Sequence, residues 1–295
     1  MAHSIKFKLS FTGNESERHE IDLYDVSEAL KGFQRSLSLT THLVLNGEII
    51  TQAPSLKGAK ILAAPPKAGS WEILALITVL GGGAYKLGTA PKNTPLGHIV
   101  HSTYDMMINK VIGQRVDYDK TLGEQVEEFK QSGGKLPDLS LPRIESLTEK
   151  CERAVKDIHR PIIESTSATT ALISSKVGKT IKTIAKPFTP KTYDLIGLEK
   201  ISEAPIELVG RISSYNSNTY KGRIFLLDAR RPVPFELREA AKHPDCLDII
   251  GGSLTSNIKF QYNKKITGGF ITVVAFTTKS ASGQIKNLTI IDIPQ

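Results

Sequence analysis

Residues 205–295 repeat short apolar alternations separated by turn residues, and this pattern limits the possible folds more than any other feature of the chain. Turn-forming Asn, Gly, Ser and Lys residues separate six segments that are predicted as strands. These segments are 206–212, 222–227, 233–237, 257–262, 270–277 and 286–293. Six short strands in this length predict a small closed or half-closed β-barrel of the OB-like or SH3-like class.

The rest of the chain predicts a second, mixed domain, as its length of 295 residues also suggests. Residues 5–11 alternate apolar side chains with Lys and Ser, which is typical of a half-buried strand. From Asp25 the apolar residues follow a helical period, and further amphipathic helices are predicted later in the chain. We expect an α+β domain at residues 1–162, with amphipathic helices on a small sheet. A Ser/Thr/Lys-rich linker or connecting segment should follow at 163–204, and the β-barrel at 205–295.

One apolar segment stands out because no residue from Ile73 to Tyr85 is charged. A membrane-spanning helix needs about 17–25 apolar residues, so this segment is too short for a permanent single span. One interpretation is a buried strand or helix followed by a glycine hinge. The alternative is a segment that self-associates or enters a membrane conditionally. Its candidate residues are Trp71, Ile73, Leu76, Leu80, Gly81, Gly82 and Gly83.

The chain carries a formal net charge of +8, and the predicted barrel holds most of it. Residues 205–295 contain twelve Lys and Arg against seven Asp and Glu, a net charge of +5. Bases stack on aromatic rings and phosphates pair with cations, so this mixture predicts binding of nucleic acid or another anionic ligand. The candidate binding residues are Arg211, Tyr215, Tyr220, Lys221, Arg223, Arg230, Arg231, Lys264 and Lys265. The alternative is that the rings belong to the core and the charges are only solvated.

The sequence contains no recognisable catalytic or cofactor motif. The glycines near residue 82 lack the spacing of a phosphate-binding loop, and no GxSxG, HExxH or CxxC pattern occurs. Two cysteines make neither a disulfide framework nor a zinc motif, and His98 and His101 have no convincing further ligands. We therefore expect no catalytic residues, no metal and no cofactor. A hydrolase whose active site is assembled from distant residues remains an alternative. No secretory signal is recognised at the N-terminus, which predicts a cytoplasmic protein.

Four stretches carry a resemblance to a known family: DLYDVSEALKGFQRSLSLTTHLVLNGE at 22–48, PPKAGSWEI at 65–73, HRPI at 159–162 and VGRISSYNSNTYKGRI at 209–224. They resemble an uncharacterised family of bacterial two-domain proteins, which have an α+β N-terminal domain and a small C-terminal β-barrel. That family is loosely associated with mobile elements and anti-phage defence islands. The resemblance implies a bacterial origin and a role in immunity, and it brings no assigned catalytic residues.

These observations together predict a non-enzymatic binding or assembly protein of a bacterial defence system. The N-terminal domain would form a homo-oligomer, and the basic barrel would bind nucleic acid or another anionic ligand. A co-encoded defence protein is a further possible partner. The alternatives are a membrane-active effector that uses residues 71–85, and the hydrolase with a dispersed active site.

Overall fold

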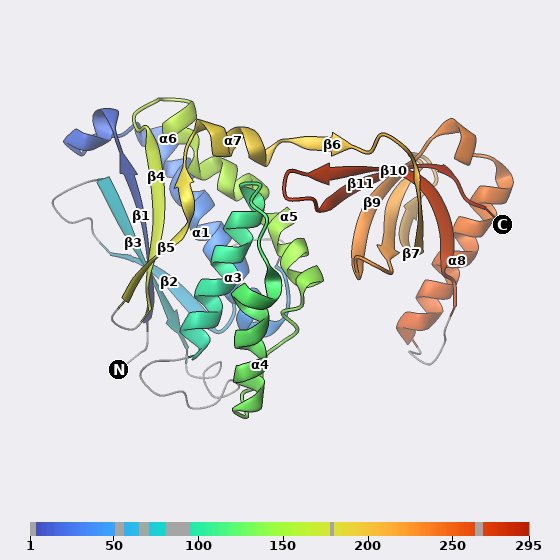
Figure 1. Cartoon of the computed structure of the whole chain (residues 1–295), viewed down its shortest axis with the longest axis horizontal. Coiled ribbons are helices and arrows are strands. Elements are labelled where there is room, and N and C mark those ends of the chain that lie inside the picture. The colour runs from blue at the N-terminus through green and yellow to red at the C-terminus, as the bar shows by residue number, and fades with distance from the viewer. Residues whose placement is uncertain are drawn as a thin grey trace. The chain divides into compact units, whose positions relative to one another are not determined.

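The computed structural model describes residues 4–50, 56–64, 71–80, 95–177, 180–262 and 268–294. The chain forms two compact units, Met1–Gly197 and Leu198–Gln295. Their elements are shown in Figure 1. The predicted fold class is confirmed, because the first unit is α+β and the second contains a closed β-barrel.

The first unit is built on a five-stranded antiparallel sheet in the order β2-β3-β1-β4-β5. On the central strand, Phe7, Leu9 and Phe11 are fully buried, whereas Lys6 and Lys8 point to the opposite face. This period of two gives the sheet one apolar face, which must be covered. The strands are β1 (Ser4–Thr12), β2 (Ala59–Ala64), β3 (Trp71–Val79), β4 (Thr170–Val177) and β5 (Thr180–Phe188).

Helices α1 (Leu23–Asn46), α3 (Pro95–Val111) and α5 (Leu141–Ile158) pack against one another and cover this apolar face (Figure 1). The predicted helix end at Gly47 is correct, since this glycine caps α1 with a φ of 72°. The helix begins earlier than predicted, because the Asp22 side chain accepts the Asp25 N–H. The other helical elements that the structure describes in this unit are η1 (Asn14–Arg18), the π-helix η2 (Asp119–Gly123), α4 (Glu124–Gln131), α6 (Arg160–Ile163) and α7 (Pro190–Ile196).

The predicted linker at 163–204 is wrong. Most of it belongs to the first unit, where β4 and β5 form a hairpin and β4 pairs with β1 along seven residues. Ala171, Ile173 and Ile184 bury their side chains in the first core, which explains why the hairpin adds to the sheet. Several of the polar residues that suggested a linker, among them Ser174, Ser175 and Thr183, lie within these strands. Threonine is β-branched and suits a strand.

The second unit is a five-stranded barrel closed by the pairing of β10 with β11. The strand order around it is β7-β8-β9-β11-β10, with β9 parallel to β11 and every other pair antiparallel. A helix joins the third and fourth strands, which together with this order is the connectivity of an OB fold. The elements are β6 (Glu199–Ile201), β7 (Ile206–Asn216), β8 (Lys221–Leu226), β9 (Arg231–Leu237), η3 (Glu239–Ala241), α8 (Pro244–Tyr262), β10 (Ile271–Ser280) and β11 (Ile285–Asp292).

Five of the six predicted barrel strands are confirmed, and the one predicted at 257–262 is wrong. Residues 257–262 form the last turns of α8 instead of a strand. Cys246 and Ile250 are fully buried in the barrel core, so the first half of the helix is anchored there. The helix continues through Gly251 and Gly252, which the sequence pattern had suggested as a turn.

Candidate functional site

The outer face of strands β7, β8 and β9 presents a row of three neighbouring side chains. Arg211, Phe225 and Pro232 lie opposite one another in the strand register. In the adjacent row, Ile212, Ile224 and Val233 point inward and are fully buried. Because side chains alternate along a strand, the first row points away from the barrel core. We call this surface the β7–β8–β9 face.

Arg211 lies beneath two aromatic rings on this face. Its guanidinium carbon is 4.4 Å from the ring centroid of Phe260 and 4.4 Å from that of Phe270. Attraction between the cation and the ring faces stabilises this arrangement. Arg211 is only 6% exposed, and its Nε has no hydrogen-bond partner among the described residues. A buried donor without a partner is unusual and indicates a site where another molecule can accept a hydrogen bond.

These side chains line a cavity of about 250 Å³. Its lining is Arg211, Ser213, Phe225, Pro232, Asn257, Phe260 and Phe270. The walls are mainly aromatic and apolar, and the cavity contains one cation and two small polar side chains. This combination suits a flat ring that stacks on the phenylalanines and carries oxygen atoms for the arginine.

The structure brings some of the predicted binding residues to this face. Lys221 and Arg223 are on β8 and point outward in the same register as Phe225, with Lys221 3.6 Å from the Glu236 carboxylate. Arg230 is exposed in the turn before β9. The face therefore carries cations on both β7 and β8.

Other predicted binding residues lie elsewhere. Tyr215 points inward, where its ring stacks on Phe235 at a centroid distance of 6.2 Å and burial raises the pKa of its phenol. Arg231 is 2% exposed and donates to the carbonyl oxygen of Ile285. Tyr220 is in the β7–β8 turn, and the Lys242 ammonium lies 4.7 Å from its ring centroid. Lys264 and Lys265 lie outside the described residues.

Sequence reasoning missed Phe260 and Phe270, which complete the cavity. Phe260 lies in the segment predicted as a strand, and Phe270 precedes β10. Their only sequence signal is aromatic character near Lys-rich residues, which does not indicate that both rings meet one arginine.

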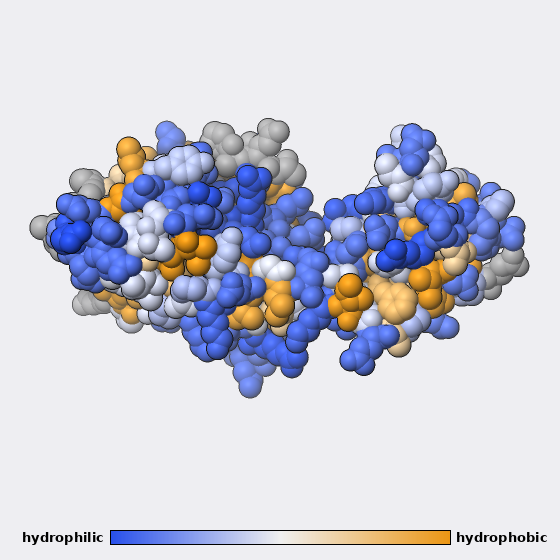
Figure 2. All heavy atoms as spheres, turned by 90° about the horizontal axis from the view of Figure 1, so that it is seen from above, coloured by the Kyte–Doolittle hydropathy of each residue, from blue (hydrophilic) through white to orange (hydrophobic). Residues whose placement is uncertain are grey.

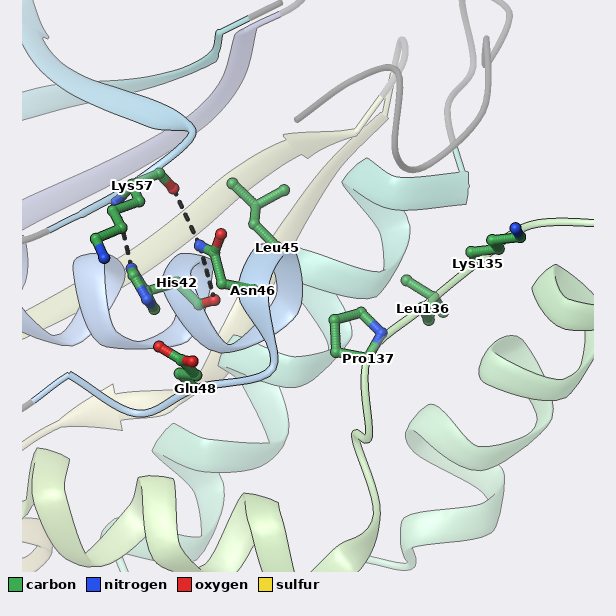
Figure 3. A pocket seen from close by; sticks show the side chains of 8 residues that line it. All are labelled: His42, Leu45, Asn46, Glu48, Lys57, Lys135, Leu136 and Pro137. Carbon is green, nitrogen blue, oxygen red and sulfur yellow. Dashed lines mark hydrogen bonds between the residues drawn. The ribbon is translucent and has the colours of Figure 1, made fainter. Parts of the chain in front are cut away.

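A second cavity, of about 530 Å³, lies at the end of α1 (Figure 3). His42 is one of its lining residues and is 1% exposed, with its Nδ1 accepting the Lys57 backbone N–H at 3.3 Å. Burial lowers the pKa of His42, so the neutral ring carries its proton on Nε2. That nitrogen is buried without a partner among the described residues. The rim carries Glu48 as well as lysines, so its charge does not select one class of ligand.

The apolar segment that begins at Trp71 forms strand β3, which pairs with β1 on one side and with β2 on the other. Trp71 packs edge-on against Phe11, and Ile73 packs against the same core. Leu76 is half-buried on the opposite face, and Leu80 is 41% exposed just after the strand. Gly81, Gly82 and Gly83 lie outside the described residues. Within the parts of the chain that the structure describes, no helix is both long and apolar enough to cross a membrane.

A serine–histidine contact lies between helix α3 and strand β4 of the first unit. The His101 ring on α3 contacts the Ser175 hydroxyl through its Nδ1. Both residues are buried, and burial lowers the pKa of His101 to about 4. The nearby Asp105 carboxylate accepts hydrogen bonds from Ala185 and Asn109 rather than from this ring. A nucleophile must reach its substrate, so this buried pair is better explained as a link between α3 and the sheet.

Comparisons with known proteins divide the chain at the same place as the structure. A domain of unknown function (DUF7946) matches residues 7–197, and a family of unknown function (DUF7947) matches residues 204–294. Neither a search of curated proteins nor a search of solved structures found a match. The chain therefore belongs to an uncharacterised two-domain family that joins DUF7946 to DUF7947.

Proposed function

We propose that the protein binds single-stranded nucleic acid on the β7–β8–β9 face of its barrel. The observation that carries this proposal is the buried Arg211, whose guanidinium lies against two phenylalanine rings and whose Nε has no partner among the residues that the structure describes. OB folds bind oligonucleotides mainly on the face of their second and third strands, which are β8 and β9 in this chain.

The chemistry of the face supports nucleic acid in particular. A base can stack on an exposed aromatic ring such as Phe270, which is 42% exposed. The outward Lys221 and Arg223 supply positive charge beside the cavity for the phosphates. A free nucleotide offers the same ring and phosphate, so it is the main competing ligand.

Fluorescence anisotropy with a labelled oligothymidine and a labelled oligouridine tests this proposal on the full-length protein. Stacking is worth about 1–3 kcal/mol per base, so Phe225→Ala should weaken binding by about 5–150-fold. Arg211→Lys keeps the charge but loses the planar stacking, and it should weaken binding by about tenfold. Lys221→Ala removes a cation that the proposal places beside a phosphate, and it should make the dependence of log K on log salt shallower by about 1.

A matched control is Arg18→Ala, which removes one exposed arginine from the first unit. It should leave oligonucleotide affinity within about twofold, because Arg18 is no part of the β7–β8–β9 face and salt weakens the interactions of exposed charges. Circular dichroism of each variant checks that the barrel is folded. Equal affinity of the folded Phe225, Arg211 and Arg18 variants would refute the proposal. Tight binding of free nucleotides without oligonucleotide binding would point instead to a nucleotide site.

We further propose that the first unit self-associates through its open sheet face. The described helices cover the opposite face, and Leu62, 52% exposed, lies beside Leu76 in the β2–β3 register. Exposed apolar side chains grouped on a sheet favour contact with another surface. Light scattering gives the mass of the purified protein, and the absorbance ratio at 260 and 280 nm shows co-purified nucleic acid. A monomer that Leu62→Lys leaves unchanged would refute self-association.

The resemblance of the sequence to a family associated with anti-phage defence suggests where such binding would be used. We propose that the protein acts in bacterial defence by assembling and binding nucleic acid. A phage challenge of cells that carry the wild type or Arg211→Ala tests this role. If both protect the cells equally, binding on the β7–β8–β9 face is not needed for defence.

A further inference from the structure

A second group of side chains gathers at the junction of α8 with the end of β11. His243 immediately precedes α8, Cys246 lies in its first turn, and Asp292 is the last residue of β11. The Sγ of Cys246 is 3.1 Å from the Nε2 of His243. One ligand atom from each of the three residues lies within 4.8 Å of the other two.

These three groups match the chemistry of zinc. Imidazole nitrogen, thiolate sulfur and carboxylate oxygen bind Zn²⁺ at about 2.0–2.3 Å, so tetrahedral ligand atoms lie about 3–4 Å apart. The three atoms therefore need only small movements to bind one ion. Three protein ligands leave the fourth position open for water or a substrate.

The surroundings fix the ligands unequally. Cys246 is fully buried in the barrel core, which holds its sulfur in place, whereas His243 and Asp292 are exposed. One oxygen of Asp292, Oδ1, accepts the Ile293 N–H at 2.8 Å, and Oδ2 is the second oxygen that could bind an ion. An ion would enter from the solvent side, between the two exposed ligands.

We infer that His243, Cys246 and Asp292 form a Zn²⁺ site that links α8 to β11. The inference is independent of the proposed nucleic-acid face, because it uses none of the residues that line that cavity. A simple thiol–imidazole hydrogen bond is the competing explanation of the 3.1 Å contact, and it requires no metal.

Cobalt(II) distinguishes the two explanations, because a thiolate bound to Co²⁺ gives a charge-transfer absorption band in the near ultraviolet. The full-length protein is stripped with a chelator and titrated with CoCl₂. We expect the band to saturate at one equivalent and to disappear when Zn²⁺ is added. A titration without this band would overturn the inference.

The two cysteines provide a matched comparison. Cys246→Ser should abolish the band, whereas Cys151→Ala, which changes the buried cysteine of the first unit, should leave it intact. Asp292→Asn alters an exposed residue and should weaken Co²⁺ binding at least about tenfold, since even outer-shell changes cost about 10–100-fold. This variant covers the case in which Cys246→Ser does not fold. A band that survives in folded Cys246→Ser, or unchanged affinity in Asp292→Asn, would refute the site as described.

Discussion

Gly32 lies where α1 meets α5, and its replacement by alanine brings two opposing effects into conflict. A Cβ at this position would lie 2.2 Å from the carbonyl oxygen of Ala154, whereas 3.4 Å would be an ordinary contact. Alanine stabilises a helix interior by about 1 kcal/mol relative to glycine. Overpacking costs about 1–3 kcal/mol, and the upper end applies here because a backbone oxygen cannot rotate away. The net expectation for Gly32→Ala is a loss of about 2 kcal/mol.

Differential scanning calorimetry of the full-length protein measures this effect. The first unit spans Met1–Gly197, and domains of that size lose about 2–4 °C of Tm per kcal/mol, so its transition should fall by about 4–8 °C. Gly251→Ala is the matched control, because it is also a helical glycine but a Cβ there meets no atom within 4 Å. That variant should gain about 1 kcal/mol and raise the transition of the second unit. If the Tm of Gly32→Ala equals or exceeds that of the wild type, the inferred close contact between α1 and α5 is wrong.

Two further predictions concern charged and titratable groups in the first unit. Asp25 is 4% exposed and accepts hydrogen bonds from the Arg160 guanidinium at 2.9–3.0 Å and from the Ser165 N–H at 2.9 Å. Since the Arg160 side chain is 29% exposed, Asp25→Ala should cost about 2–3 kcal/mol, at or below the low end of the range for breaking a buried pair. Chemical denaturation should show this loss, whereas Glu28→Ala breaks only an exposed pair with Lys31 and should have a much smaller effect. Equal effects of the two substitutions would contradict the reasoning. Burial lowers the pKa of His159 to about 4 from 6.5, so the unfolded chain takes up its proton first and stability falls as the pH drops from about 6.5 to about 4. This group contributes a loss of about 3 kcal/mol, and unfolding measured from pH 7.5 to 4 should be less pH-dependent in His159→Gln than in the wild type.

The barrel could be predicted from the sequence because its strands alternate strictly and turn residues separate them. Ile224 and Leu226 point inward while Arg223 and Phe225 point outward, which is visible as a period of two in the sequence. The parallel pairing of β9 with β11 was not predictable, since it joins segments about fifty residues apart in the chain.

The errors have a common physical origin in polar or small residues that occupy regular elements. Ser174 and Ser175 are buried in β4, where pairing with β1 satisfies the backbone and outweighs their weak strand preference. Gly251 and Gly252 are exposed within α8, which continues through them because the helix is anchored on the barrel by Cys246 and Ile250. In both cases tertiary contacts override the local preference of the sequence.

In the candidate site too, local sequence patterns were predictable and tertiary contacts were not. Arg211 was predicted because an arginine beside aromatic residues on a strand is a local pattern. Its burial between Phe260 and Phe270 depends on a helix that crosses the outer face of the barrel, and the sequence pattern placed a strand there. The two phenylalanines that bury the arginine were therefore not predictable from the sequence pattern.

Helix α8 is the element that joins these observations. Its C-terminal half carries Asn257 and Phe260, which form a wall of the arginine cavity, while Cys246 in its first turn lies against His243 and Asp292. A metal bound at the N-terminal end would hold α8 against β11, and a rigid α8 would in turn hold Phe260 over Arg211. If both sites exist, Zn²⁺ should strengthen oligonucleotide binding, and Asp292→Asn should remove that strengthening while leaving the metal-free affinity unchanged. Coupling of this kind is reciprocal, so an oligonucleotide should tighten Zn²⁺ binding by the same factor. An oligonucleotide affinity that does not change when Zn²⁺ is added would show that the two sites are not coupled through this helix.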